Sequence, residues 1–429
     1  MASRQLTLIP DEPQTIEQNY TCTFADNTTL GIHRWFRYSA GFSALWVREV
    51  IEAEKANGRC RIIDPFAGSG TVLLEAERSD VEAIGIEAHP FVTRVAQAKL
   101  HWREDPRIFL DFALSILDRA KREKGDIGTY PRLIHKCFPP DVLLALHSLR
   151  EAWRSMADNS PFSELAWLTL VSILRVCSPV GTAQWQYVLP GKVKAKTAHP
   201  YHAFEEKAYL MAGDMAAQRK VMSSTSAMLF RDDARLCRQV SDDWADLVVT
   251  SPPYANNYDY ADATRLEMSF MGEVQGWGDL QEVVRKHLVR ACSQHMVGMD
   301  GELDRMLHNQ LLAPISREIA PVCKELESER ENHGGRKAYH TMIAAYFLDM
   351  AETWMALRRV TTDGALVCFV IGDSAPYGIY VPVHEWLGKL AVAAGFKGHS
   401  FEKLRDRNVK WKNRKHRVPL QEGRLWVKG

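Results

Sequence analysis

The chain has 429 residues and a formal net charge of +1, with 46% hydrophobic and 25% charged residues. This composition is ordinary for a soluble globular protein whose core is large enough to hold a rigid site. The sequence has no run of about 18 apolar residues and no N-terminal secretion signal, which excludes a membrane-spanning protein and leads us to expect a soluble, cytoplasmic one without a membrane partner.

The net charge and the cysteines bear on nucleic-acid binding, on metal or disulfide sites and on the cellular compartment. With a net charge of only +1, nucleic-acid binding requires that basic residues gather locally. The eight cysteines show no CxxC spacing, so the sequence predicts neither a metal site nor a disulfide framework. Reduced thiols in a cytosol fit this pattern best.

The start of the chain has the alternation of an α/β domain. A helix is predicted over residues 39–56, followed by a strand at 61–63 that breaks into the turn DPFAGSG. A second helix at 71–77 and a second buried strand at 83–86 follow, and this strand ends at Glu87. Strand, glycine turn, helix, strand and acid are the opening of a doubly wound fold.

Strands return after a long helical stretch. Residues 101–225 are mostly helical in pattern, and strands are predicted at 227–230 and 246–250, the latter running directly into the sequence SPPY. A helix at 341–359 and a nearly continuous apolar strand at 365–373 complete the alternation.

We therefore divide the chain into three parts. Residues 1–100 hold an N-terminal helix and the first half of the sheet, residues 101–225 form an inserted, mostly helical domain, and residues 226–429 hold the second half. The last part carries a helical insertion at about 270–340, with a loop predicted at 327–337, and a basic C-terminal segment.

The turn from Asp64 to Thr71 predicts a ligand site. Gly68 and Gly70 let the backbone turn tightly and approach a ligand where a Cβ would clash. The turn follows a strand, and open α/β sheets bind ligands at the carboxyl ends of their strands. Asp64 is placed to hold either a ligand ammonium or the backbone of the turn. The alternative is an ordinary strand-to-helix turn.

Acidic residues at later strand ends extend this interpretation. Glu87 ends the second strand, where an acid accepts hydrogen bonds from ribose hydroxyls in dinucleotide folds. Asp232 and Asp233 follow the third strand, where an acid is placed to accept from an adenine amino group. The alternative for each is a solvated acid. The third glycine of the pyrophosphate fingerprint is missing, which argues against a dinucleotide-dependent oxidoreductase.

The second motif is Ser251-Pro252-Pro253-Tyr254, directly after a strand. Two prolines stiffen the chain past the strand end, and each keeps the residue before it extended. The Ser251 side chain and the Pro252 carbonyl become rigid acceptors beside the flat face of Tyr254. Such a site suits a planar base that presents an amino group, with rate gained from positioning and oriented dipoles. The alternative is a rigid surface turn.

Together these motifs resemble those of the amino-group DNA methyltransferases of restriction-modification and orphan systems. Asp64–Thr71 matches their cofactor motif, and Ser251–Tyr254 matches their catalytic motif of Asp, Asn or Ser followed by two prolines and an aromatic residue. The resemblance covers roughly residues 30–100 and 227–400. It implies a class I methyltransferase fold: a Rossmann-like, doubly wound, mostly parallel seven-stranded sheet with helical insertions.

The resemblance also implies S-adenosylmethionine as the cofactor. Ser39 and Phe42 lie where the family has an N-terminal helix that closes over the methionine part of this cofactor. The expected cofactor-binding residues are Asp64, Phe66, Ala67, Gly68, Ser69, Gly70, Thr71, Glu87, Asp233, Ser39 and Phe42. The expected catalytic residues are Ser251, Pro252, Pro253 and Tyr254.

The serine form of the catalytic motif usually accompanies N4-cytosine specificity in this family, so we expect N4 of cytosine in DNA. N6 of adenine in DNA or an RNA base is the second hypothesis, and a catalytically silent nucleic-acid-binding module is the third. The cofactor motif precedes the catalytic motif here, whereas N4-cytosine members often have the reverse order. This leaves open which insertion reads the DNA sequence, and residues 101–225 are one candidate.

A base inside double-stranded DNA cannot reach a methyl donor at the strand ends, so the target base must be flipped out. Phosphate contacts help to offset the energy of flipping. The best candidate for these contacts is the basic segment 403–417, and the alternative is a solvated, charged hairpin. The expected DNA-binding residues are Lys403, Arg405, Arg407, Lys410, Trp411, Lys412, Arg414, Lys415 and Arg417. The resemblance also allows a cognate restriction endonuclease as a partner.

Overall fold

The computed structural model describes residues 24–122, 125–183, 186–219, 224–256, 258–299, 301–335, 337–407 and 419–429. The centre of this part of the chain is a seven-stranded sheet with the order β5-β2-β1-β6-β7-β9-β8. The strands are β1 (Arg61–Asp64), β2 (Glu82–Ile86), β5 (Met228–Phe230), β6 (Ala245–Thr250), β7 (Thr361–Gly372), β8 (Gly398–Arg407) and β9 (Leu420–Lys428).

The sheet is mostly parallel. Strands β5, β2, β1, β6 and β7 pair in parallel, whereas β9 is antiparallel to both β7 and β8. The predicted Rossmann-like α/β fold with a seven-stranded sheet is therefore confirmed. The strand order reverses between β1 and β6, because β2 and β5 lie on one side of β1 and the later strands on the other. Ligands of open α/β sheets bind beside such a reversal, at the carboxyl ends of the strands.

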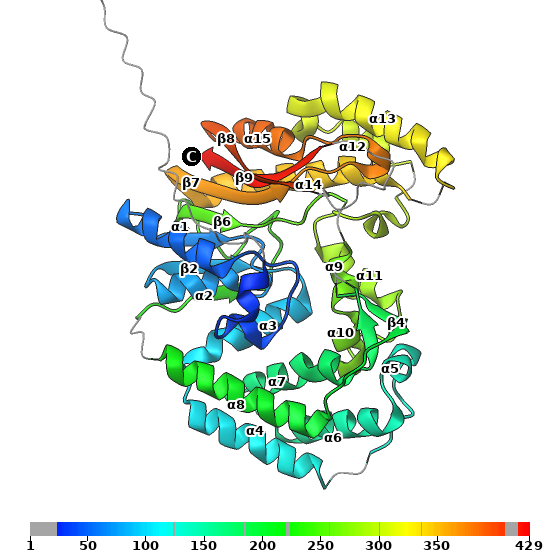
Figure 1. Cartoon of the computed structure of the whole chain (residues 1–429). Helices are drawn as coiled ribbons and strands as arrows, with labels where there is room; N and C mark the ends of the chain where they lie inside the picture. Colours follow the sequence, from blue (N-terminus) through cyan, green and yellow to red (C-terminus); the bar gives the residue numbers. More distant parts are fainter. Residues whose placement is uncertain are drawn as a thin grey trace, which may run out of the picture.

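Helices cover both faces of the sheet, because successive residues of a strand point to opposite faces. Ile62 and Leu247 belong to one apolar layer with α1 and α2, and their neighbours Ile63 and Val248 belong to the opposite layer with α14 and α15. These helices are α1 (Ala44–Ala56), α2 (Thr71–Arg78), α14 (Tyr339–Val360) and α15 (Val383–Ala393). Two further helices, α12 (Leu303–Leu307) and α13 (Ser316–Asn332), lie over α14 (Figure 1).

A second apolar core lies beside the sheet and is built mostly of helices (Figure 1). Two separate stretches of the chain contribute to it, one before and one after β6. Its elements are α3 (Pro90–Leu100), α4 (Pro106–Ala120), α5 (Arg132–Cys137), α6 (Pro140–Met156), α7 (Pro161–Cys177), α8 (Pro200–Gln218), α9 (Tyr260–Ala263), α10 (Arg265–Met271) and α11 (Asp279–Val283). The hairpin β3 (Val180–Thr182) and β4 (Val188–Val193) lies next to it.

Single turns of 3-10 helix connect these elements. They are η1 (Phe24–Thr28), η2 (His33–Trp35), η3 (His101–Arg103), η4 (Arg285–His287), η5 (Ser293–Met296), η6 (Gln310–Ile315) and η7 (Pro376–Gly378). No helix in the described ranges is long and apolar enough to cross a membrane.

Two predicted boundaries are wrong. The helix predicted from residue 39 begins at Ala44, because the side chain of Ser43 accepts a hydrogen bond from the Trp46 backbone and caps the first turn. The loop predicted at 327–337 is helical through Asn332, because its glutamate and arginine residues are good helix formers. The chain turns only after it, where Gly334 has a φ of +77°.

Candidate active site

The loops that carry the two sequence motifs meet at one edge of the sheet. β1 and β6 are neighbouring parallel strands, and they end at Asp64 and Thr250, respectively. The Thr250 hydroxyl donates a hydrogen bond of 2.6 Å to Asp64 Oδ1, and both side chains are buried. The glycine turn and the SPPY sequence are thus fastened together where the strand order reverses.

The glycine turn needs its glycines for two different reasons. Gly68 and Gly70 have φ values of +52° and +86°, a region that other residues rarely adopt. A Cβ on Gly70 would lie 3.3 Å from the Cβ of Ala96, so this glycine also lets α3 approach the turn. A Cβ on Gly68 would lie 3.3 Å from the Tyr38 ring. Asp64 Oδ1 accepts from the Phe66 backbone at 3.0 Å, which holds the turn.

Glu87, at the end of β2, closes the turn from the other side. Its two carboxylate oxygens accept from the backbone N–H groups of Gly68 and His89, each at 2.8 Å. Burial raises the pKa of Glu87 to about 7. Burial likewise raises the pKa of Asp64 to about 7, although hydrogen bonds from Thr250 and Phe66 oppose the shift. Burial leaves the ionised carboxylates poorly solvated, so a ligand that donates hydrogen bonds to them would bind favourably.

Ser251 presents an acceptor to the same region. Its hydroxyl donates to the Val370 carbonyl of β7 at 3.2 Å, which uses the single hydroxyl proton, so the oxygen presents its lone pairs as acceptors. Tyr254 follows the prolines, its hydroxyl interacts with the Ser251 side chain, and the Arg407 guanidinium lies 4.9 Å from its ring centre. Burial raises the pKa of the Tyr254 hydroxyl, so this side chain is neutral.

A pocket lies between the two loops. Its wall includes six residues expected from the sequence, and these are Phe66, Gly68, Glu87, Asp233, Ser251 and Pro253. The structure thus brings residues of both motifs to one cavity.

Other expected residues lie near the pocket but not in its wall. Ala67, Ser69 and Thr71 are buried beneath the glycine turn, and Pro252 is buried behind Ser251. Phe42 is buried against Trp46 in the layer of α1. Ser39 donates its backbone N–H to the Gln186 side chain. Contact of these residues with a cofactor stays a prediction.

Asp233 is held by an arginine. Arg235 donates to its carboxylate through both the backbone and the guanidinium, and it also pairs with the buried Asp349 of α14 at 3.1 Å. Asp349 accepts in turn from the Arg290 backbone at 2.9 Å. This network connects the acid after β5 to the segment that carries His287–Val289 in the pocket wall.

Sequence reasoning missed several wall residues. These are Tyr38, Ala40, Pro65, Ala88, His89, Ala234, Tyr260, His287, Leu288 and Val289. His89 is buried, its ring bonds the Thr264 hydroxyl at 2.9 Å, and burial lowers its pKa to about 4, so it is neutral. The stretch around Ser39 did signal one edge of the pocket, but Tyr38 and Ala40 form it. The segment 287–289 carries no motif.

The basic C-terminal segment is described only in part. Lys403 pairs with Asp406 at 2.8 Å, Arg405 pairs with Glu422 at 2.8 Å, and Arg407 donates to the Asp373 carbonyl at 2.9 Å. The remaining expected DNA-binding residues lie outside the described residues; they are Lys410, Trp411, Lys412, Arg414, Lys415 and Arg417. Phosphate contacts by this segment stay a prediction.

The fold and the pocket define a Rossmann-like α/β protein consistent with a methyltransferase, with a ligand site at the reversal of the strand order. The chain is 25% identical to the type II methyltransferase M.BsoBI of Geobacillus stearothermophilus over an alignment that covers 93% of this chain and 85% of that protein. It is also 25% identical to the type II methyltransferases M.AvaI of Nostoc sp. and of Anabaena variabilis, over 87% of this chain and 81% of each relative. It thus shares distant similarity with type II methyltransferases over most of its length.

No protein-family model matches the chain, and no solved structure matches it significantly.

Proposed function

We propose that this protein is a type II DNA methyltransferase that transfers a methyl group from S-adenosylmethionine to N4 of cytosine. The observation that carries the proposal is the single pocket lined by Gly68 and Glu87 on one side and by Ser251 and Pro253 on the other. The similarity to type II methyltransferases over most of the chain supports it independently.

The residues around the glycine turn fit this cofactor. Asp64 Oδ2 is buried and has no hydrogen-bond partner among the described residues, so it offers an acceptor that a ligand ammonium would satisfy. The Glu87 carboxylate keeps lone pairs for ribose hydroxyls, and Asp233 lines the pocket where an adenine amino group would lie. When bound, S-adenosylmethionine supplies a methyl group on a positively charged sulfur.

The SPPY side of the pocket handles the target amino group. Ser251 Oγ and the Pro252 carbonyl accept its hydrogens, which favours a more tetrahedral nitrogen whose lone pair is free to attack. These acceptors are fixed before the reaction by the prolines and by the Ser251 bond to β7, so little reorganisation is required. The protein would gain rate mainly by holding the two reacting groups in line.

The choice of cytosine rests on Ser251, because the serine form of this motif usually accompanies N4-cytosine specificity in the family that the chain resembles. N6 of adenine in DNA or an RNA base is the alternative substrate. The target base would be flipped out of duplex DNA into the pocket. We assign sequence recognition to residues 101–225 and phosphate contacts to the segment 403–417.

The decisive experiment is to express the chain in cells that lack methylated DNA bases and to analyse the nucleosides by mass spectrometry. We expect N4-methylcytosine in the DNA, and sequencing of modified bases would report its context. N6-methyladenine as the sole product would overturn the choice of base. Unmodified DNA together with no binding of S-adenosylmethionine in calorimetry would favour a silent nucleic-acid-binding module.

A further inference from the structure

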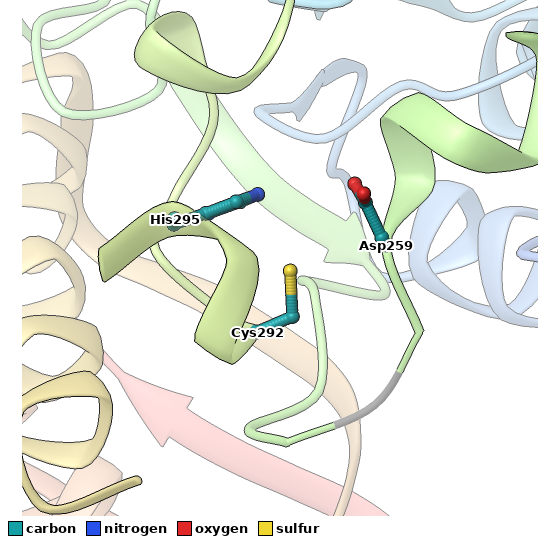
Figure 2. A group of neighbouring side chains, drawn as sticks. All are labelled: Asp259, Cys292 and His295. Atoms are coloured by element: carbon teal, nitrogen blue, oxygen red, sulfur yellow. The ribbon is translucent and has the colours of Figure 1, made fainter. Parts of the chain in front are cut away.

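Three potential metal ligands converge next to the pocket. Asp259, Cys292 and His295 are buried, and each offers one ligand atom within 4.8 Å of the others. Figure 2 shows the three side chains directed toward a common point. Asp259 is the N-cap of α9, Cys292 immediately precedes η5, and His295 lies within it. The Cys-x-x-His spacing places two of the ligands on one helical turn.

The ring of His295 is poorly satisfied. The residue is 5% exposed, and its ring lies beside the Val289 backbone, but no hydrogen bond of normal geometry reaches either ring nitrogen from the described residues. An unpaired polar group at this depth is unfavourable, because it loses its bonds to water without replacement. A cation that accepts the lone pair of one ring nitrogen would remove the penalty at that nitrogen, and the other nitrogen would carry the N–H next to the Val289 backbone.

The chemistry of the three side chains selects the cation. A thiolate, an imidazole and a carboxylate suit Zn²⁺, whereas Mg²⁺ and Ca²⁺ prefer oxygen ligands alone. Zinc with bonds of about 2.0–2.3 Å holds one sulfur, one nitrogen and one oxygen ligand roughly 3.3–3.6 Å apart, so ligand atoms that lie within 4.8 Å of one another have to approach by up to about 1.5 Å. Three protein ligands leave the fourth position of the tetrahedron for water.

The charges near the cluster are compatible with a divalent cation. Arg285 donates to Asp259 Oδ2 at 2.6 and 3.0 Å, while Oδ1 accepts from the Ala261 backbone at 3.1 Å as its one bond within the described part of the chain and keeps a lone pair. Binding would release one proton, from the Cys292 thiol. The thiolate and the Asp259 carboxylate would then offset both charges of the cation, and Arg285 would remain as one positive charge.

We propose that Asp259, Cys292 and His295 form a zinc site that joins two segments of the pocket wall. Asp259 directly precedes Tyr260, and Cys292 follows Val289 by three residues, and both Tyr260 and Val289 line the pocket. The metal would therefore fix the part of the pocket wall that Tyr260 and Val289 form. The eight cysteines gave no such signal, because the carboxylate and the Cys-His pair are far apart in sequence.

The test is zinc binding to the full chain after removal of metal by a chelator. We expect calorimetry and metal analysis to give one Zn²⁺ per chain, and no binding of Mg²⁺. Replacing zinc with Co²⁺ should give the absorption of a tetrahedral site with a thiolate-to-cobalt band. His295→Gln and Cys292→Ala should weaken zinc binding at least about 100-fold, more than loss of an outer-shell partner does.

Matched controls separate this site from other thiols. Cys323→Ala removes a buried cysteine of the α13 layer, and Cys60→Ser removes an exposed one, and both should keep full zinc binding. The absence of zinc binding in the wild-type chain, or unchanged binding in both ligand variants, would overturn the proposal. If a ligand variant fails to fold, the wild-type cobalt spectrum decides, because an octahedral spectrum without a thiolate band would also overturn it. These measurements do not depend on methyl transfer, so they stand apart from the proposed function.

Discussion

The hydrogen bond between Thr250 and Asp64 offers a direct test of how the two loops are held together. Thr250→Val removes the hydroxyl and keeps the shape of the side chain, so the 2.6 Å bond to Asp64 Oδ1 is lost in a buried place. A hydrogen bond to a charged group contributes about 1.5–3 kcal/mol, and one between neutral groups contributes about 0.5–1.5 kcal/mol. The size of the loss therefore depends on the charge of Asp64.

The pKa of Asp64 makes this dependence measurable. Burial raises its pKa to about 7 in the folded protein, above the value of about 3.9 expected in the unfolded chain. A carboxyl with a raised pKa contributes stability that is present at low pH and lost as the pH rises through the folded pKa. Thr250→Val should increase this loss of stability at high pH, because the Thr250 hydroxyl stabilises the ionised form of Asp64. We expect a destabilisation of about 1.5–3 kcal/mol at pH 8.5 and about 0.5–1.5 kcal/mol at pH 5.5.

Urea unfolding at the two pH values measures the difference. The matched control is Thr169→Val, because Thr169 is also fully buried but donates to the Leu165 carbonyl of its own helix at 2.9 Å. That variant should lose about 0.5–1.5 kcal/mol at both pH values. If Thr250→Val destabilises the protein equally at pH 5.5 and pH 8.5, the bond to an ionised Asp64 is not what fastens the loops.

Three further predictions concern the reaction. Ser251→Ala should lower turnover on the order of 100-fold or more with nearly unchanged affinity for S-adenosylmethionine, as expected for a lost transition-state acceptor. The control Ser172→Ala removes a half-buried hydroxyl of α7 and should keep full turnover. Normal activity of the Ser251 variant would contradict the role assigned to Ser251. Gly68→Val should lose affinity for the cofactor, because a valine strains the positive φ and crowds Tyr38. The control Gly58→Val strains a φ of +89° in open space and should bind the cofactor normally. Equal cofactor affinities of the two variants in calorimetry would place the cofactor elsewhere. Affinity for S-adenosylmethionine should rise by up to about tenfold per pH unit below the pKa of Glu87, which is about 7, because the ligand favours the ionised form of this carboxyl. Glu87→Gln should flatten this dependence of affinity on pH. An unchanged slope in that variant would exclude Glu87 as its source.

The local chemistry of a few residues was enough to predict the core of the fold. The strands that became β1, β2, β5, β6 and β7 were all expected from apolar runs bounded by turn residues, within a few residues of their observed ends. The antiparallel strands β8 and β9 were not predicted, because the charged β8 sequence alternates weakly. Their pairing depends on contact with β7, which no local pattern records.

For the helices, too, the sequence predicts local structure better than it predicts exact ends and packing partners. Ser43 caps α1 through its side chain, and the sequence alone did not distinguish this start from one at residue 39. The helices α9–α11 share a core with α4–α8, although β6 separates the two stretches in the chain. Burial of this kind depends on faces that match across long sequence separations, so periodicity predicts the helices but not their partners.

The sequence by itself determined the chemistry of the two loops: glycines that permit a tight turn, an acid at a strand end, and a serine held rigid by two prolines. Each of these effects acts over a few bonds, so it can be predicted before the fold is known. Only the tertiary structure placed Asp64 next to Thr250, 186 residues away, added Tyr38 and His287–Val289 to the pocket wall, and brought Asp259 to Cys292 and His295. The physical reason is that the order of the strands in the sheet, and not the order of the residues in the chain, decides which side chains share a cavity.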